Sequence, residues 1–161
     1  MITDPVAMAS TMNSIFVGMG KSVASKIPNS KKLFSDYLGE SSRVNIILNP
    51  CSTAEISKLI SGLNLSKASG PYSIPSNIIR SFKDVFIEPI TSLVNKSLAE
   101  GIFPEIFKWA SVLPFFKKND KTKCSNYRPI SLLSNISKIF ERAMYNRIDL
   151  FLNEFDIIYK N

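Results

Sequence analysis

The stretch SVLPFFKKNDKTKCSNYRPISLL, residues 111–133, decides the fold. Two apolar segments, 111–116 and 127–133, flank a polar loop. This pattern is typical of two antiparallel strands that form a ribbon with a long tip. From Phe115 to Leu133 the chain carries five basic residues and one acidic residue, which is +4 of its net +7. A tip this basic either lies solvated or binds a polyanion.

The segments before the ribbon have the patterns of helices. Asp4 followed by Pro5 predicts a helix start, because aspartate is a favoured N-cap and proline is favoured at the first helical position. Ser52 and Glu55 form a capping-box pattern that predicts a second helix start. Between these two starts, residues 28–45 form a polar connector and the best candidate for a domain boundary.

Further helical segments lie on both sides of the ribbon. Pro75 predicts the start of a helix that Pro89 is expected to break or restart and that Gly101 is expected to end. After the ribbon, Ser134 or Asn135 is expected to cap the longest helix of the chain. The sequence therefore predicts a mostly helical α+β fold with one short antiparallel ribbon.

The composition excludes several classes of function. The chain has 161 residues and no histidine, which excludes histidine triads and most zinc sites. Its two cysteines lie far apart and do not suggest a disulfide framework. No signal-peptide pattern or membrane-length apolar run is present, so the sequence predicts an intracellular, non-secreted protein without a membrane partner, with nucleus or cytoplasm left open. The 20 basic and 13 acidic residues favour a partner that carries phosphates.

Three stretches, taken in order, carry a resemblance to a known family. They are LNLSKASGPYSIPSNII, LVNKSLAEGIFPEIFKWASVLPFFKKND and SNYRPISLLSNISKIFERAMYNRIDLFL. Together they resemble the reverse transcriptases of non-LTR retrotransposons, LINE elements of the jockey-like kind. The resemblance implies a helical linker over residues 1–45 and a partial reverse transcriptase domain over residues 46–161.

By this resemblance the second segment is the fingers portion of a right-hand polymerase, whose ribbon folds over the incoming nucleotide. Lys117, Lys118 and Arg128 then correspond to nucleotide-binding residues that grip the triphosphate, for which the forked donors of arginine are well suited. The implied partners are an RNA template, a DNA primer and a deoxynucleoside triphosphate. Weaker nucleic-acid contacts are expected at Lys67, Lys121, Lys123, Lys138 and Arg142.

A plainer interpretation stands beside several of these roles. On charge alone, Lys117 and Lys118 are a solvated hairpin tip, and the SKASGP loop that carries Lys67 is only a loop with a C-capping role. Arg142 and Arg147 are typical of a solvated helix face.

The sequence departs from the family in two places. Tyr72 stands where the family usually has an acidic residue, and Phe107 stands where it usually has a tryptophan. Both substitutions put local packing in doubt more than the assignment.

The resemblance also implies that the catalytic centre lies outside this chain. The metal-binding aspartates of the family belong to the palm, which is expected to begin beyond Asn161, and the six aspartates present are scattered along the sequence. We therefore expect no catalytic residue, no metal ligand and no small-molecule cofactor here, with Mg²⁺ bound only in the intact enzyme, and no polymerase activity from the chain alone. A stand-alone basic nucleic-acid-binding module and a non-functional retroelement relic remain the alternatives.

Overall fold

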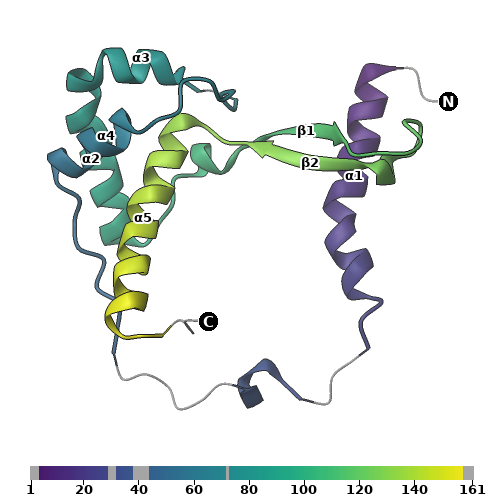
Figure 1. The fold of residues 1–161 in the computed structure, drawn as a ribbon, viewed down its shortest axis with the longest axis horizontal. Helices are drawn as coiled ribbons and strands as arrows, with labels where there is room; N and C mark the ends of the chain where they lie inside the picture. The colour runs from purple at the N-terminus through teal and green to yellow at the C-terminus, as the bar shows by residue number, and fades with distance from the viewer. Residues whose placement is uncertain (1–3, 29–31, 38–43, 72, 158–161) are drawn as a thin grey trace. The chain divides into compact units, whose positions relative to one another are not determined.

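The computed structural model describes residues 4–28, 32–37, 44–71 and 73–157 (Figure 1). It consists of helices and one two-stranded sheet. The elements in chain order are α1 (Pro5–Ala24), η1 (Phe34–Tyr37), α2 (Thr53–Ser61), α3 (Ser76–Ser81), α4 (Lys83–Glu100), η2 (Glu105–Lys108), β1 (Ser111–Phe116), η3 (Cys124–Asn126), β2 (Tyr127–Leu132) and α5 (Asn135–Glu154). The mostly helical α+β class expected from the sequence is confirmed.

The chain divides into two compact units, described separately below. The first comprises Met1–Val44 and Val112–Ile130, and therefore includes α1 and most of the ribbon. The second comprises Asn45–Ser111 and Ser131–Asn161, with helices α2 to α5. Among the described residues, no helix is long and apolar enough to cross a membrane.

In the first unit, the ribbon has the two antiparallel strands that the apolar pattern predicts. The backbone N–H of Lys117 donates to the carbonyl of Asn126 at 2.8 Å, and strands Ser111–Phe116 and Tyr127–Leu132 have matching lengths. In this antiparallel register Pro114 lies opposite Pro129, as a pair that exchanges no ladder hydrogen bonds. Neither proline therefore removes a bond that the ribbon needs, which explains how both strands tolerate one.

Helix α1 begins where the sequence predicts. The carboxylate of Asp4 accepts a hydrogen bond from the backbone N–H of Ala7 at 2.7 Å, and Pro5 occupies the first turn. Pro5 costs no hydrogen bond there, because the first N–H groups of a helix have no intrahelical acceptor.

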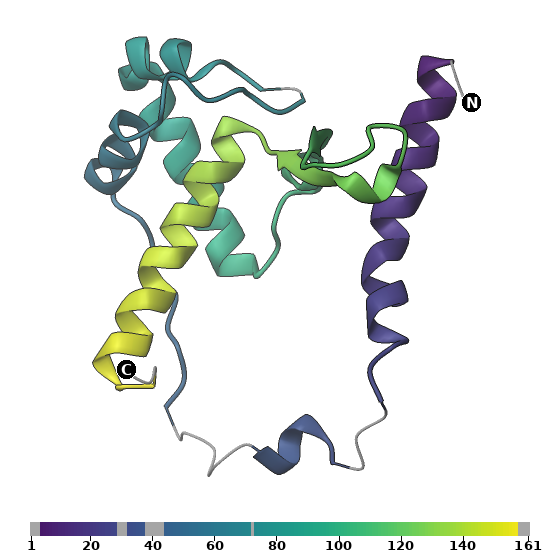
Figure 2. The ribbon, with the colours of Figure 1, turned by 45° about the vertical axis from the view of Figure 1, so that its right-hand side comes forward.

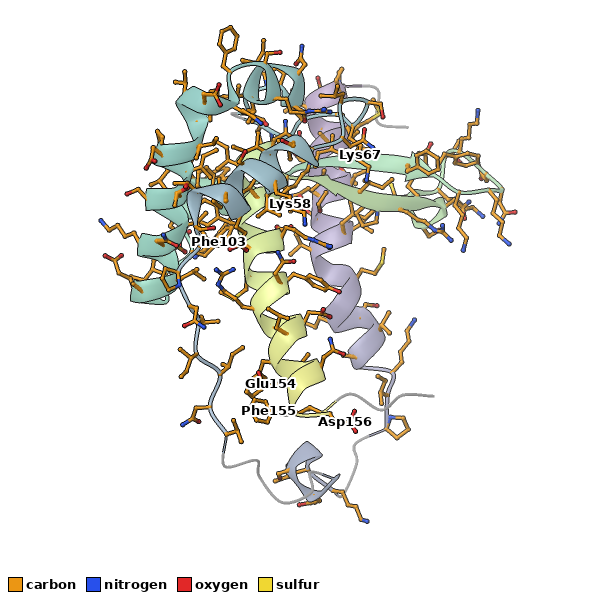
Figure 3. All side chains as sticks on the ribbon, turned by 60° about the vertical axis from the view of Figure 1, so that its left-hand side comes forward. Lys58, Lys67, Phe103, Glu154, Phe155 and Asp156 are labelled. Carbon is orange, nitrogen blue, oxygen red and sulfur yellow. The ribbon has the colours of Figure 1, made fainter. Side chains whose placement is uncertain are left out.

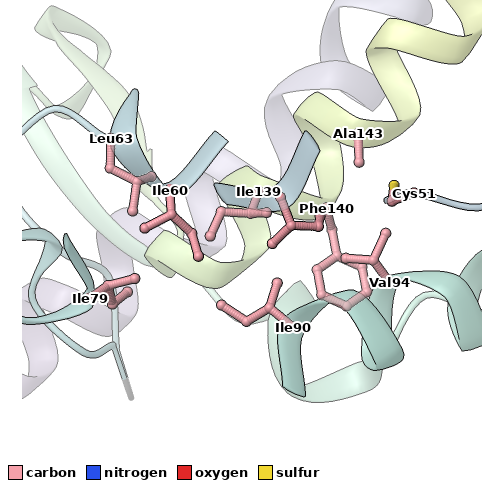
Figure 4. Packing of buried hydrophobic residues seen from close by; sticks show 10 residues of the cluster. Cys51, Ile60, Leu63, Ile79, Ile90, Val94, Ile139, Phe140 and Ala143 are labelled. Carbon is pink, nitrogen blue, oxygen red and sulfur yellow. The ribbon is translucent and has the colours of Figure 1, made fainter. Parts of the chain in front are cut away.

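The second unit packs its helices around one hydrophobic core (Figure 4). Ile56 and Ile60 of α2, Ile90 of α4 and Ile139 of α5 are almost completely buried. Further buried residues of the cluster are Cys51, Leu63, Ile79, Val94, Phe140 and Ala143. Both views of the ribbon show α5 passing α4 and α2 (Figure 1, Figure 2). Side chains far apart in sequence thereby come together between α2 and α5.

Three helix starts in this unit, after Ser52, Pro75 and Ser134, agree with the sequence, and one predicted interruption does not. Ser52 accepts from the backbone N–H of Glu55 at 3.1 Å, and Ser134 accepts from that of Ser137 at 3.0 Å. Gly101 ends α4 with a φ of +67°. The expectation that Pro89 breaks the helix is wrong, because Pro89 lies inside α4 and the break falls at Phe82. Pro89 has no backbone N–H, so one helical hydrogen bond is missing at this turn. The segment stays helical because Ile90 and Val94 are buried in the core.

Phe107, the residue that departs from the family pattern, is part of a cluster of three aromatic rings. Its ring centroid lies 5.3 Å from that of Phe140 and 6.5 Å from that of Phe103. A phenylalanine therefore fills this position with good aromatic contacts. Tyr72 lies outside the described residues.

Candidate functional site

The basic tip of the ribbon is a defined turn rather than a loose loop. Asp120 organises it by accepting hydrogen bonds at one oxygen from the backbone N–H (2.9 Å) and the hydroxyl (2.7 Å) of Thr122. The hydroxyl bond from Thr122 is the main reason why the pKa of the Asp120 carboxyl is lowered. The side-chain amide of Asn126 donates to the carbonyl of Asp120 at 2.8 Å, and the Tyr127 hydroxyl donates to the carbonyl of Lys121 at 2.9 Å. These bonds fix the backbone from which the tip lysines project.

Lys117 and Arg128 lie on one face of the ribbon. Lys117 is opposite Asn126, so Arg128 is opposite Phe115, and alternate positions of a strand share a face. The other face carries Phe116 and Tyr127, whose ring centroids are 5.4 Å apart. Among the described residues neither Lys117 nor Arg128 has an ion pair, and both side chains are exposed. Two of the three predicted nucleotide-binding residues thus present unpaired positive charge on the same face.

The remaining tip lysines are arranged differently. Lys118 follows the last residue paired across the ribbon, so the strand register does not assign it to a face. Lys121 lies over the ring of Phe116, with its Nζ 5.5 Å from the ring centroid, and therefore belongs to the face opposite Arg128. Lys123 immediately precedes the short helix η3 and is exposed.

The other three predicted nucleic-acid contacts come together in the second unit. A groove of about 1150 Å³ between α2 and α5 is lined by Lys67, Lys138 and Arg142. Lys58 of α2 lines the same groove, and it is a basic residue that the sequence reasoning missed (Figure 3 labels Lys58 and Lys67). Lys58 lies three residues after Glu55, on the polar side of α2. Only the packing of α2 against α5 shows that Lys58 lines the same groove as Lys138 and Arg142.

The lining of the groove combines apolar side chains with basic ones. Leu59, Leu63 and Ile139 contribute to the lining, and none of the lining residues is aromatic. Lys58, Lys67 and Arg142 are exposed and have no ion pair among the described residues. Arg142 lies over the ring of Tyr145 at 4.7 Å from the guanidinium carbon, a contact that restrains its side chain.

Asn135 connects the loop that bears Lys67 to the helix that bears Lys138. Its buried side-chain amide donates to the hydroxyl of Ser69 (3.1 Å) and to the carbonyl of Ile74 (2.9 Å). Its amide oxygen accepts from the Lys138 ammonium at 3.1 Å. Asn135 therefore contacts Lys138 directly and ties the loop segment two residues after Lys67 to the start of α5.

Gly70 allows this loop to reach the start of α5. Its N–H donates to the carbonyl of Leu133 at 3.2 Å. A Cβ at position 70 would lie 2.3 Å from the carbonyl oxygen of Leu132. Only glycine permits so close an approach of the two backbones.

Arg147 also lines the groove, but its charge is already paired. Its guanidinium donates to both carboxylate oxygens of Glu55, at 3.0 and 3.2 Å, and to the carbonyls of Ala143 and Asn49. The ion pair lowers the pKa of Glu55 and raises that of Arg147. The interpretation of Arg147 as part of a solvated helix face is wrong, since its side chain is only 9% exposed.

A second pocket and the acidic side chains bear on where else a ligand or a metal ion could bind. A second, apolar pocket of about 340 Å³ lies between α4 and α5, and its lining contains no basic residue. Within the part of the chain that the structure describes, no group of three or more cysteine, aspartate or glutamate side chains could hold a metal ion. The basic tip and the basic groove are therefore the candidate sites for a phosphate-bearing ligand.

Comparison with known proteins gives these two sites a context. No protein-family model matches the chain. The chain is 32% identical over 114 residues to the RNA-directed DNA polymerase from mobile element jockey of Drosophila melanogaster, a match that covers 70% of the chain and 12% of that protein. It is 30% identical over 105 residues to the Pol polyprotein from type-1 retrotransposable element R1 of Bradysia coprophila, covering 64% and 10%. It is 28% identical over 120 residues to the probable RNA-directed DNA polymerase from transposon BS of Drosophila melanogaster, covering 74% and 13%.

The three matched proteins are all named as products of mobile elements or transposons. The resemblance of the chain to the reverse transcriptases of non-LTR retrotransposons is confirmed over most of its length. The chain spans only 10 to 13% of the length of these relatives. It is thus homologous to one short segment of such a polymerase.

Proposed function

We propose that this chain is the fingers portion of an RNA-directed DNA polymerase of a non-LTR retrotransposon, and that its ribbon tip holds the triphosphate of the incoming nucleotide. The observation that carries the proposal is the common face of Lys117 and Arg128, two exposed positive charges beside an ordered turn that have no ion pair within the described part of the chain. A triphosphate is a compact polyanion, and a lysine with a forked arginine is a suitable donor set for it. Lys118, one residue further into the turn, is the third residue of this proposed triphosphate-binding set.

The reaction that these residues serve is phosphoryl transfer. Positioning and neutralisation of the triphosphate supply much of the catalysis in this class of reaction. The tip accordingly acts by binding and orientation. The remaining requirement is a pair of metal ions held by clustered carboxylates. The described residues offer no such cluster, which supports the further proposal that the chain alone does not extend a primer.

A stand-alone nucleic-acid-binding module is the second candidate function. The groove favours it, because Lys58, Lys67 and Arg142 are exposed there without ion-pair partners among the described residues. In the parent polymerase the same groove would contribute contacts to the RNA template or the DNA primer.

Equilibrium binding of dATP and dAMP to the full chain tests the primary proposal. The chain is expected to prefer dATP, and the double variant Lys117→Gln/Arg128→Gln is expected to lose that preference. Lys121→Gln/Lys123→Gln is the matched control, since it removes two charges from the same tip and leaves Lys117 and Arg128 in place. Equal effects of the two double variants would show a general charge effect and contradict a specific grip.

A further inference from the structure

The face of the ribbon that carries Lys117 and Arg128 also carries exposed apolar side chains. Directly opposite residues of β1 and β2 project to the same face, so Phe115 shares this face with Arg128 (Figure 1). Leu113 and Ile130 form the next pair on it, because alternate residues of a strand share a face. Phe115 is 61% exposed, Leu113 50% and Ile130 43%. One face therefore combines two cations with an exposed aromatic ring and an apolar pair.

The aromatic rings on the other face of the ribbon are already engaged. Phe116 and Tyr127 contact each other there with ring centroids 5.4 Å apart, and Lys121 lies over the ring of Phe116. Both aromatic residues are half-buried. Within the described part of the chain Phe115 has no ring contact of this kind. Its ring is thus the exposed, unpartnered one, and it lies directly across from Arg128.

We infer that Phe115 contacts the base of the nucleotide whose triphosphate the ribbon tip holds. The inference rests on the proposed function, since it takes the ligand to be a deoxynucleoside triphosphate. Lys117 follows Phe115 by two residues, a distance of about 7 Å at the rise of an antiparallel strand. A nucleoside triphosphate has the same two-part character, because the sugar joins a planar base to a chain of phosphates. Phosphates bound at the two cations leave the base within reach of the exposed ring.

A phenylalanine suits a site that has to accept each of the four bases. Its ring has no hydrogen-bond donor or acceptor that could read the edge of a base. Stacking on an aromatic side chain tolerates any base, because every base has a π-face. Neither strand of the ribbon contains an acidic residue that would repel the phosphates. Phe115 is therefore expected to add affinity for the nucleoside part of the ligand, while the two cations supply affinity for its triphosphate.

Equilibrium binding of dATP and of inorganic tripolyphosphate, which has no base, to the full chain tests the inference. Phe115→Ala is expected to weaken dATP binding by about fivefold or more and to leave tripolyphosphate binding unchanged. Phe115→Tyr keeps the ring and is expected to bind dATP as the wild type does. Phe82→Ala is the matched control, because Phe82 is 57% exposed and belongs to the second unit, and it is expected to change neither affinity.

Three results would overturn the inference. One is an unchanged affinity for dATP in Phe115→Ala, which would show that the base does not contact the ring. Another is an equal loss of affinity for dATP and tripolyphosphate, which would show that the substitution disturbs the tip. The third is a wild-type chain that binds neither ligand, a result that would also contradict the proposed function. Binding of both ligands by the wild type with no effect of Phe115→Ala would overturn this inference alone, so the two failures are distinguishable.

Discussion

Arg147 of α5 holds Glu55 of α2 in a two-pronged ion pair, with guanidinium–carboxylate distances of 3.0 and 3.2 Å. The two residues are 92 positions apart, so the pair fixes the last helix to the start of the first helix of the second unit. It also neutralises the carboxylate of Glu55, one of the two acidic residues among the described residues that line the groove. The ion pair is therefore a structural feature, and Lys58, Lys67 and Arg142 remain exposed without an ion pair among the described residues.

Loss of this pair is expected to destabilise the fold. Glu55→Gln leaves the mostly buried Arg147 guanidinium without its counter-charge, at a cost of about 2 kcal/mol in the free energy of unfolding. Urea denaturation of the full chain measures this. Lys96→Ala is the control, because the Lys96–Glu100 pair is exposed and 3.9 Å long, and its loss is expected to cost under about 0.5 kcal/mol. Equal costs for the two variants would contradict a special role for Arg147.

The same pair predicts how stability depends on pH. The hydrogen bond from Arg147 lowers the pKa of Glu55 below its ordinary 4.5 in the folded state. The unfolded chain therefore binds a proton first as pH falls, and the stability contributed by Glu55 is complete above about pH 5 and is lost as pH decreases through the lowered pKa. Urea midpoints between pH 7 and pH 3 are expected to fall less steeply in Glu55→Gln than in the wild type. Parallel curves would show that Glu55 does not contribute.

Gly70→Ala is expected to disturb the loop that carries Lys67. The new methyl group would lie 2.3 Å from the carbonyl oxygen of Leu132, so a backbone has to move, at a cost of about 1–3 kcal/mol. Gly18→Ala makes the same chemical change in α1, where no atom lies within 4 Å of the new Cβ, and is expected not to lower stability. Thermal unfolding compares the two. A Gly70→Ala protein as stable as Gly18→Ala would show that the loop does not approach Leu132 this closely.

Arg128→Lys is expected to weaken triphosphate binding although it preserves charge. Lysine cannot reproduce the forked donors of arginine, so the affinity for dATP is expected to fall severalfold, with a larger fall in Arg128→Gln. Arg80→Lys in α3 is the matched control, and the dissociation constants come from equilibrium dialysis. Full affinity in Arg128→Lys would mean that the tip recognises charge alone.

The features predictable from sequence are those that depend on neighbours along the chain. The ribbon follows from two short apolar runs around a polar loop, and the helix starts at Asp4, Ser52 and Ser134 follow from capping within three residues. The rule that proline interrupts a helix fails at Pro89, because the burial of Ile90 and its neighbours in the core keeps the segment helical.

The site was only partly predictable for the same reason. The tip charges lie within one short stretch, so their excess is visible in the sequence. The groove requires α2 to pack against α5, and the cations it joins, Lys58 and Lys138, lie 80 positions apart. Arg147 looked solvated because nothing near it in sequence reveals Glu55 as its partner. A pairing between distant elements is set by the packing of the whole unit, which local patterns do not encode.

Residue-resolved mapping of the triphosphate site tests the central claim most directly. In a titration of the isotopically labelled full chain with dATP, followed by ¹H–¹⁵N correlation spectra, the largest shifts are predicted at Lys117, Lys118 and Arg128, with much smaller shifts for dAMP. Such a result would support the proposal that the ribbon is the nucleotide-binding element of a polymerase. Shifts that avoid these three residues, or that are equal for dATP and dAMP, would contradict the claim.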